Sequence, residues 1–308
     1  MTGPATRHLG IDLGGTNIKW ALVEQHTDGR WLLLDKSQVP TPDQGPVRVV
    51  AEMADVARLA VATWPDAATL GIGVPGLYDP MTGVTRMLPN LQGDWNGVPV
   101  AATVAGALGL PVAMINDARA FGLAELRLGA GRGSSTMVGL TLGTGVGGVV
   151  CVGGRVHQGH DGTAGELGHQ TLEPEGPPCT CGSNGCLEAL VRADRIEDLC
   201  GTATAEEAFT RARAGDPRAK AGLAEIGRYL GIGIANLIVV MTPDKVVIGG
   251  GMSAASDLLM DPIHAEVRRR VTTTALDEVA IVTAELGTWA GAIGAAIHGA
   301  ESAAGMAA

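Results

Sequence analysis

Two strand–turn–strand segments with glycine at the turn constrain this chain more than any other feature of its sequence. The first runs from His8 to Gln25 and the second from Thr136 to Val152, and a shift of 129 residues places Gly10-Ile-Asp-Leu-Gly14 over Gly139-Leu-Thr-Leu-Gly143. After the first turn, Ile18, Trp20 and Leu22 alternate with Asn17, Lys19 and Ala21, which is the period of a strand. A Rossmann or P-loop turn would instead open into a helix. The repeat predicts two related lobes that face each other across a cleft.

Bare backbone at such turns suits a phosphate group. Glycine lets phosphate oxygens approach backbone N–H groups closely, and in the first hairpin Gly14 and Gly15 form the tip while Asp12 stands at its mouth. An ordinary hairpin would explain one such turn, but its repetition favours a ligand. A third glycine run, Gly249–Gly251, precedes a helix beginning near Ser253. That run could cradle a nucleotide or be a plain turn, and the sequence leaves both open.

Apolar periodicity places the remaining elements. Helices are predicted at Pro46–Trp64, Pro99–Leu108, Ala118–Leu128, most of Ala205–Met241 and Gly287–His298, strands at Leu70–Val74, Pro111–Ile115 and Lys245–Ile248, and a frayed tail over Ala300–Ala308. The second of these strands delivers Asn116 and Asp117 at its carboxyl end. An Asp at this position is often only a helix N-cap. Open α/β sheets bind ligands at the same edge, however, which favours a catalytic Asp117 that could also cap.

One histidine and three cysteines have the spacing of metal ligands. They are His169, Cys179, Cys181 and Cys186, and the proline- and glycine-rich residues between them favour a tight loop. Buried free thiols are a weaker explanation, because three of the five cysteines fall within eight residues beside a histidine. A disulfide framework is also disfavoured in a long chain with few cysteines and no secretory signal. We expect a closed, structural Cys3His zinc site.

Composition excludes several classes of function. A formal net charge of −10 argues against a sequence-independent grip on nucleic acid, whose phosphates require Lys and Arg. The first seven residues hold no apolar signal core, and no uninterrupted apolar run reaches the roughly 18 residues of a membrane span. We therefore expect a cytoplasmic protein that binds neither nucleic acid nor membrane.

The motifs as a set resemble the ROK family (repressors, open reading frames, kinases) of sugar kinases from about His8 to His298. The segments that carry the resemblance are Asp12-Leu-Gly-Gly-Thr16, Ile115-Asn-Asp117, Leu142-Gly-Thr-Gly145, Gly165-Glu-Leu-Gly-His169, Cys179–Glu188 and Ile248-Gly-Gly-Gly251. The cysteine loop is highly specific, whereas each glycine turn alone is weak. The resemblance implies an actin-like (ribonuclease H-like) fold of two α/β lobes. Residues 8–116 with 288–300 would form the first lobe, and residues 117–287, with the zinc loop at 179–186, the second.

The resemblance also implies roles for individual residues. Asp117 would be the general base, and the sugar contacts would be Gly76, Asn90, Asn116, Glu166, His169 and Glu188. His169 would bind zinc through one ring nitrogen and face the sugar through the other. ATP and its Mg²⁺ would be bound by Asp12, Gly14, Gly15, Thr16, Lys19, Thr144, Gly145, Gly250 and Gly251. The implied reaction is ATP-dependent phosphorylation of the 6-hydroxyl of glucose or a close analogue, by a homo-oligomer (a dimer or tetramer).

Several alternatives stay open at this stage. After Glu188 the run from Ala189 to Arg195 replaces the Ala-Ser-Gly-rich run usual in glucokinases, so the substrate could be an amino sugar such as kanosamine, N-acetylmannosamine or N-acetylglucosamine. Polyphosphate could replace ATP. A sugar-responsive ROK regulator is disfavoured, because only seven residues precede His8 and the charge is acidic. A non-catalytic sugar-binding protein is disfavoured by Asp117 together with three glycine turns.

Overall fold

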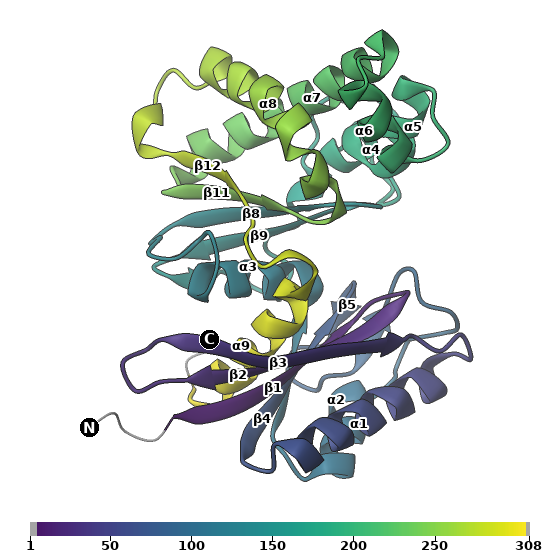
Figure 1. Cartoon of the computed structure of the whole chain (residues 1–308), viewed down its shortest axis with the longest axis vertical. Coiled ribbons are helices and arrows are strands. Elements are labelled where there is room, and N and C mark those ends of the chain that lie inside the picture. The colour runs from purple at the N-terminus through teal and green to yellow at the C-terminus, as the bar shows by residue number, and fades with distance from the viewer. Residues whose placement is uncertain (1–4, 306–308) are drawn as a thin grey trace. The chain divides into compact units, whose positions relative to one another are not determined.

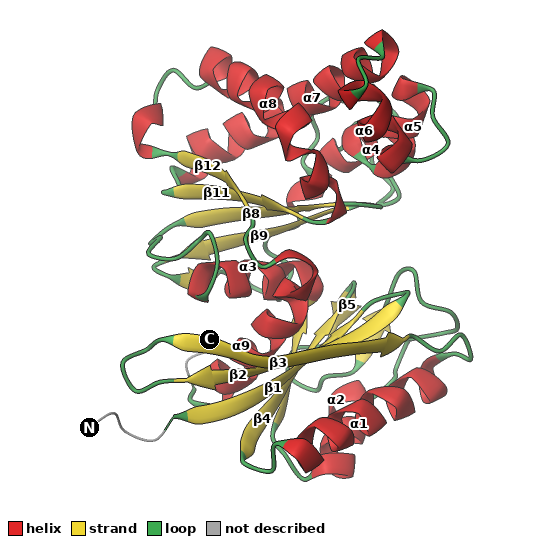
Figure 2. Cartoon of the chain, viewed as in Figure 1, coloured by secondary structure: helices red, strands yellow, loops and turns green. Residues whose placement is uncertain are grey.

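The computed structural model describes residues 5–305, which form two compact units, shown in Figures 1 and 2. One unit holds the described residues up to Arg132 together with those from Leu286 onward, and the other is Gly133–Glu285. Each unit contains a five-stranded mixed sheet with helices packed against it. The chain therefore folds as two α/β units.

The sheet of unit 1 has the strand order β3-β2-β1-β4-β7. β1, β2 and β3 form an antiparallel meander, whereas β4 and β7 run parallel to β1. The strands are β1 (Thr6–Leu13), β2 (Asn17–Gln25), β3 (Trp31–Pro40), β4 (Ala67–Val74) and β7 (Val112–Asn116), with a small hairpin of β5 (Leu77–Tyr78) and β6 (Thr85–Met87). The helices are α1 (Pro46–Thr63), α2 (Val100–Leu108), α3 (Asp117–Arg127) and α9 (Ala290–Ala303), which follows the 3-10 turn η4 (Gly287–Trp289).

Successive residues of β1 face opposite sides of the sheet, and they show that α1 and α2 cover one face while α9 covers the other. Leu9, Ile11 and Leu13 point into the core shared with α1 and α2. Gly10 lies on the other face, where an added Cβ would stand 2.0 Å from the carbonyl oxygen of Ala292 in α9. Glycine and alanine thus let α9 pack with its backbone almost against the sheet.

The predicted frayed tail is wrong at its start, because helix α9 extends into it. The helix continues to Ala303, Ala300 is buried, and Glu301 forms an ion pair of 2.7 Å with Arg127 of α3. Packing on α3 therefore holds a last helical turn that composition alone could not predict. The part of the predicted tail at residues 306–308 lies outside the described residues.

The sheet of unit 2 has the order β10-β9-β8-β11-β12 and repeats the arrangement of unit 1. β8 and β9 form an antiparallel hairpin, and β11 and β12 run parallel to β8. The strands are β8 (Met137–Leu142), β9 (Val146–Val152), β10 (Arg155–Val156), β11 (Lys245–Gly249) and β12 (Ala280–Thr283). The helices are α4 (Leu187–Val191), α5 (Ala193–Cys200), α6 (Ala205–Arg213), α7 (Pro217–Met241) and α8 (Ser256–Arg270), with 3-10 turns η1 (Leu167–His169), η2 (Gly251–Ala255) and η3 (Leu276–Glu278).

The range Ala205–Met241, predicted to be mostly helical, consists of two helices, α6 and α7. Asp216 caps α7 by accepting hydrogen bonds from the backbone N–H groups of Arg218 and Ala219, and Pro217 occupies its first turn. By length and composition α7 could cross a membrane, but 56% of its most apolar window is buried inside the structure. Ile226, Leu230 and Ile234 lie in the core of unit 2, which is typical of a core helix.

The division between the units falls later in the chain than the sequence boundary at residues 116 and 117. Helix α3 belongs to unit 1, because it packs on α9 so closely that a Cβ on Gly294 would stand 1.8 Å from the carbonyl oxygen of Ala120. The return to unit 1 falls at Leu286, close to the predicted residue 288.

A buried carboxylate holds both chain segments that pass between the units. Glu125 of α3 is fully buried, and its two oxygens accept hydrogen bonds from the backbone N–H groups of Ala130 at 2.8 Å and Leu286 at 2.9 Å. The first of these residues precedes the passage into unit 2, and the second is where the chain returns.

Candidate functional site

The carboxyl ends of three parallel strands in unit 1 bring together residues from distant parts of the sequence. Asp12 is the next-to-last residue of β1, Gly76 follows β4, and Asp117 follows β7. Burial and the charge of Asp117 raise the pKa of Asp12 to about 7, and the ammonium group of Lys19, its partner across the hairpin, opposes this shift. A cation bound beside this pair of carboxylates would favour their charged forms.

Asn116 is the N-cap of helix α3, and Asp117 shares one of its two backbone donors. The side-chain oxygen of Asn116 accepts hydrogen bonds from the backbone N–H groups of Ala118 at 3.1 Å and Arg119 at 3.3 Å, while its amide donates to the carbonyl oxygen of Gly76 at 3.3 Å. Asp117 is the first residue of the helix. The N-cap position, which the sequence left open for Asp117, is therefore held by Asn116, while the carboxylate of Asp117 accepts a hydrogen bond of 2.8 Å from the backbone N–H of Ala118.

The first glycine turn is held in place by two distant segments. Three residues, Gly14–Thr16, connect β1 and β2. The hydroxyl of Thr41 donates a hydrogen bond of 2.6 Å to the carbonyl oxygen of Gly14. Asn90 has a left-handed backbone with φ 64°, and a Cβ on Gly15 would stand 2.7 Å from its carbonyl oxygen. The structure thus brings Asn90 to the turn, and it adds Thr41, which no sequence motif pointed to.

Gly76 is required where the chain leaves β4. Its φ is 85°, and an added Cβ would lie 2.4 Å from the carbonyl oxygen of Met87 and 2.5 Å from Pro89. The residues before Asn90 therefore pack directly on Gly76, and both predicted sugar contacts lie in one loop cluster of unit 1.

The second glycine turn, Gly143–Gly145, also has three residues. The side chain of Glu188 packs against it. The carboxylate of Glu188 accepts a hydrogen bond of 2.9 Å from the backbone N–H of Val146. A Cβ on Gly145 would stand 2.5 Å from the same carboxylate. The other oxygen of Glu188 accepts a hydrogen bond of 3.3 Å from the hydroxyl of Thr180 in the cysteine loop. Glu188 therefore joins the turn to the cysteine loop, a contact that spacing could not predict.

Close packing on β9 places Glu166 and His169. An added Cβ on Gly168 would stand 2.1 Å from the carbonyl oxygen of Val146, and one on Gly148 would stand 2.5 Å from that of Gly165. These glycines let the 3-10 turn Leu167–His169 lie against the strand that follows the second glycine turn. Glu166 precedes this turn and is exposed.

The third glycine run packs against the second hairpin. Gly250 has a φ of 88°, and its Cβ would lie 2.3 Å from the carbonyl oxygen of Leu142. The run opens into the 3-10 helix Gly251–Ala255 and only then into α8, so the predicted helix near Ser253 begins with a different kind of turn. A Cβ on Gly143 or Gly251 would meet nothing within 4 Å, and the exposed Thr144 lies beside Gly143. Open backbone at both places can accept phosphate oxygens.

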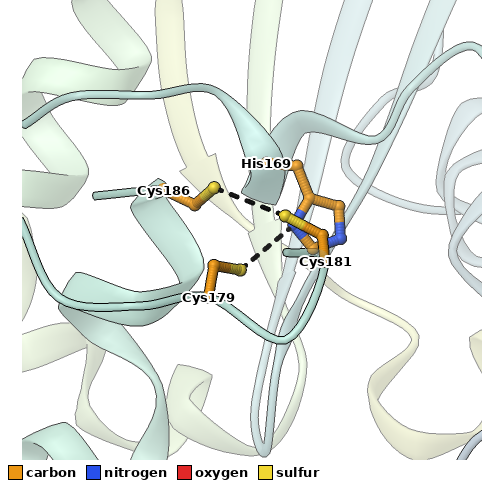
Figure 3. Close-up of side chains that lie close together, drawn as sticks. All are labelled: His169, Cys179, Cys181 and Cys186. Atoms are coloured by element: carbon orange, nitrogen blue, oxygen red, sulfur yellow. Dashed lines mark hydrogen bonds between the residues drawn. The ribbon is translucent and has the colours of Figure 1, made fainter. Parts of the chain in front are cut away.

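Figure 3 shows the four candidate metal ligands pointing toward one another. Their ligand atoms all lie within 4.8 Å of one another, with 3.7 Å between the sulfurs of Cys181 and Cys186 and 3.6 Å between the sulfur of Cys179 and Nδ1 of His169. Zinc–sulfur bonds of about 2.3 Å put the sulfurs of a tetrahedral site about 3.8 Å apart. The donor set and its spacing therefore fit Zn²⁺.

The thiol of Cys186 is protonated in the absence of a cation, whereas hydrogen bonds from Ser183 and Cys179 lower the pKa of Cys181. Burial and the neighbouring thiols of Cys181 and Cys179 raise the pKa of Cys186 to about 12. A divalent cation would reverse this effect, because metal coordination deprotonates a thiol.

Known proteins are similar to this chain over nearly its whole length. The chain matches the ROK family over residues 8–300. It is 35% identical to a glucokinase of Thermotoga maritima, with 95% of this chain and 97% of that protein covered. A ROK hexokinase structure from Thermus thermophilus is 37% identical with a TM-score of 0.87, covering 97% of this chain and all of that one. A ROK family glucokinase from Streptomyces griseus, in complex with glucose and AMPPNP, is 32% identical with a TM-score of 0.76, covering 96% and 99%.

Proposed function

The chain belongs to the ROK family, and we propose that it transfers the γ-phosphoryl group of ATP to the 6-hydroxyl of glucose or a close analogue. Its fold is the actin-like, two-lobed α/β fold of sugar kinases, as the sequence resemblance predicted. Its glucokinase relatives are similar over nearly their full length, so the sequence similarity is not limited to a nucleotide-binding module.

The observation that carries the proposal is the position of Asp117. Phosphoryl transfer needs positioning, stabilisation of charge and a group that accepts the proton of the attacking hydroxyl. Asp117 is half-buried at the carboxyl edge of the sheet, and Asn116 already caps the helix. Asp117 is therefore our candidate for the general base, with typical effects of about 10²–10⁴ on the rate.

Hexose hydroxyls each require a donor or acceptor, and amide, carboxylate and imidazole groups supply them. We assign the sugar contacts to Asn90, Asn116, Glu166, His169 and Glu188, with Gly76 shaping the loop. Asn116 and Glu188 are supported by rigid backbone contacts, and such support keeps a binding group close to its productive geometry.

The nucleotide is assigned to the three glycine runs. Gly14, Gly15 and Thr16 would present backbone to phosphate from unit 1, with Lys19 as a cation and Asp12 beside the Mg²⁺. Thr144, Gly145, Gly250 and Gly251 would do so from unit 2. Support comes from Gly15, Gly145 and Gly250, where neighbouring atoms leave no room for a side chain, so that the turns present backbone alone.

We further assign one structural Zn²⁺ to His169, Cys179, Cys181 and Cys186. The bound ion would cross-link the loop that carries Thr180 and Glu188. Because Nδ1 of His169 faces Cys179, the second ring nitrogen remains for the sugar.

An assay for the hexose phosphate formed tests the proposal, because this product is common to both phosphoryl donors. Glucose, mannose, kanosamine, N-acetylmannosamine and N-acetylglucosamine would each be offered with ATP or with polyphosphate. We expect the highest kcat/KM with ATP and glucose or a close analogue. A higher value with an N-acetylated or amino sugar would move the substrate to that class, and no transfer to any hexose from either donor would overturn the proposal.

Oligomeric state and location belong to the same proposal. We expect a homo-oligomer, a dimer or tetramer, in the cytoplasm, and light scattering coupled to gel filtration measures the mass directly. A monomeric mass near 31.3 kDa at assay concentration would contradict the first expectation.

A further inference from the structure

Arg192 lies at the break between two helices, α4 and α5, that are hydrogen-bonded to the second glycine turn. It follows α4 and precedes α5, with an extended backbone of φ −62° and ψ 166°. The next residue, Ala193, donates a backbone hydrogen bond of 3.3 Å to the carbonyl oxygen of Gly143. At the start of α4, Glu188 accepts the hydrogen bond from Val146. Helix α4 is therefore attached to one end of the turn and the first residue of α5 to the other, and Arg192 directly precedes the second attachment.

The guanidinium of Arg192 has a partner that is easily exchanged. It pairs at 2.7 Å with Asp194, only two residues away, whose side chain is 59% exposed. Exposed pairs of this kind contribute little to stability. A phosphate group offers a planar guanidinium stronger, charge-assisted hydrogen bonds.

No charged side chain of unit 2 is among the residues assigned to the nucleotide. The residues of unit 2 assigned to the nucleotide are a threonine and glycines, and the assigned cation, Lys19, belongs to unit 1. Backbone N–H groups carry only partial charges, whereas the phosphate chain is strongly anionic and this protein has a net charge of −10. Arg192 is a cationic side chain directly before Ala193, whose backbone N–H binds the carbonyl oxygen of Gly143.

We propose that Arg192 binds the phosphate chain of the nucleotide at the Gly143–Gly145 turn, exchanging Asp194 for phosphate oxygens when ATP is present. The inference rests on the proposed kinase function and on the assignment of this turn to ATP. It makes Arg192 a determinant of nucleotide affinity that discriminates by number of phosphates. No sugar contact is involved.

The test compares Arg192→Gln, Arg192→Lys and the control Arg211→Gln. Arg211 also forms an exposed ion pair, with Glu207 on α6, and has no contact with the turn among the interactions described for it. Zinc content and thermal melting would be measured for each variant. Steady-state constants for ATP and glucose would be measured, along with the Kd of ADP and AMP by calorimetry.

We expect Arg192→Gln to raise the KM for ATP and the Kd of ADP by about tenfold or more, since hydrogen bonds to charged groups are among the stronger ones. The Kd of AMP and the KM for glucose should change less than about twofold, because they do not depend on the phosphate chain. The KM for ATP and the Kd of ADP in Arg192→Lys should lie between those of wild type and Arg192→Gln, because lysine keeps the charge but cannot form the paired hydrogen bonds of a guanidinium. Arg211→Gln should match wild type.

An unchanged KM for ATP in Arg192→Gln would overturn the inference. Equal losses for ADP and AMP, with lower melting temperature, would also overturn it, since they indicate a purely structural role. Failure of the kinase proposal itself is separate, because it would appear as absence of hexose phosphorylation by the wild-type protein.

Discussion

Asn116 and Asp117 divide two tasks at the end of β7. The amide oxygen of Asn116 accepts hydrogen bonds from two backbone N–H groups of α3, and Asp117 also accepts from one of them, so an isosteric change at Asp117 that keeps an acceptor oxygen leaves the cap in place. An uncharged isostere at Asp117 can still accept a hydrogen bond from a sugar hydroxyl, but it is too weak a base to take the proton. Capping and catalysis can therefore be separated by a single substitution.

Asp117→Asn should fold, keep its zinc and bind glucose with similar affinity, while kcat falls at least about a hundredfold. The measurements are initial rates under saturating ATP, glucose binding by calorimetry, and zinc by elemental analysis. Asp55→Asn, an exposed substitution at an ion pair with Arg58, is the matched control and should keep full kcat. Near wild-type turnover in Asp117→Asn would mean that another group is the base.

At the scale of elements, the cysteine loop and the second glycine turn act as one element through Glu188. Purified protein should hold one zinc per chain, because four ligand atoms lie within 4.8 Å of one another. Cys181→Ala should lose the metal and weaken glucose binding as well, since the loop that supports Glu188 and His169 loses its cross-link. Cys200→Ala removes a buried thiol outside the cluster and should keep its zinc. A full zinc content in Cys181→Ala would refute the assignment.

Helix α3 is a second element that binds a distant part of the chain, because its Glu125 accepts a hydrogen bond from Leu286. Glu125→Gln replaces an acceptor oxygen by an amide N–H group, so one of the two backbone donors at Ala130 and Leu286 loses its partner. An unsatisfied buried donor costs about 1–3 kcal/mol. All five tryptophans, at positions 20, 31, 64, 95 and 289, lie in unit 1, so their fluorescence during urea unfolding reports this unit.

The control for that measurement is Glu52→Gln, which changes an exposed ion pair on α1 of the same unit. Its free energy of unfolding should stay within about 0.5 kcal/mol of wild type. A similarly small effect in Glu125→Gln would show that the buried carboxylate is not what holds the two segments.

At the scale of the whole molecule, two buried histidines make stability depend on pH. Burial lowers the pKa of His8 and of His298 to about 4 from an ordinary value of 6.5. Above about pH 6.5 neither the folded nor the unfolded state binds these protons. Between about pH 6.5 and 4 the unfolded state binds them and the folded state does not, so stability falls as the pH falls.

Each histidine should contribute up to about 1.4 kcal/mol of lost stability per pH unit in that window. Urea unfolding followed by tryptophan fluorescence at pH 7.5, 6 and 5 measures the slope for unit 1. His8→Gln should reduce this slope by one proton, whereas His160→Gln, at an exposed histidine, should leave it unchanged. An identical slope in His8→Gln and wild type would show that His8 titrates normally in the folded state.

Much of the architecture was predictable, because it depends on short-range patterns. The repeated hairpins appear as β1–β2 and β8–β9, each with a three-residue turn. Helix α1 and the strand ending at Asn116 lie where periodicity placed them. The end of α9 was missed, since its last turn is held by Arg127, which is 174 residues away along the chain.

Sequence by itself determined the turns, the strand ends and the members of the Cys/His cluster, because these depend on residues close together in the chain. Only the tertiary structure decided that Asn116 is the cap, that Glu188 supports the second glycine turn and that Ala193, next to Arg192, binds Gly143. Only it could show that Glu125 binds Leu286, 161 residues further along the chain. A hydrogen bond is satisfied by whichever donor the packing brings within about 3 Å, and no local pattern records that choice.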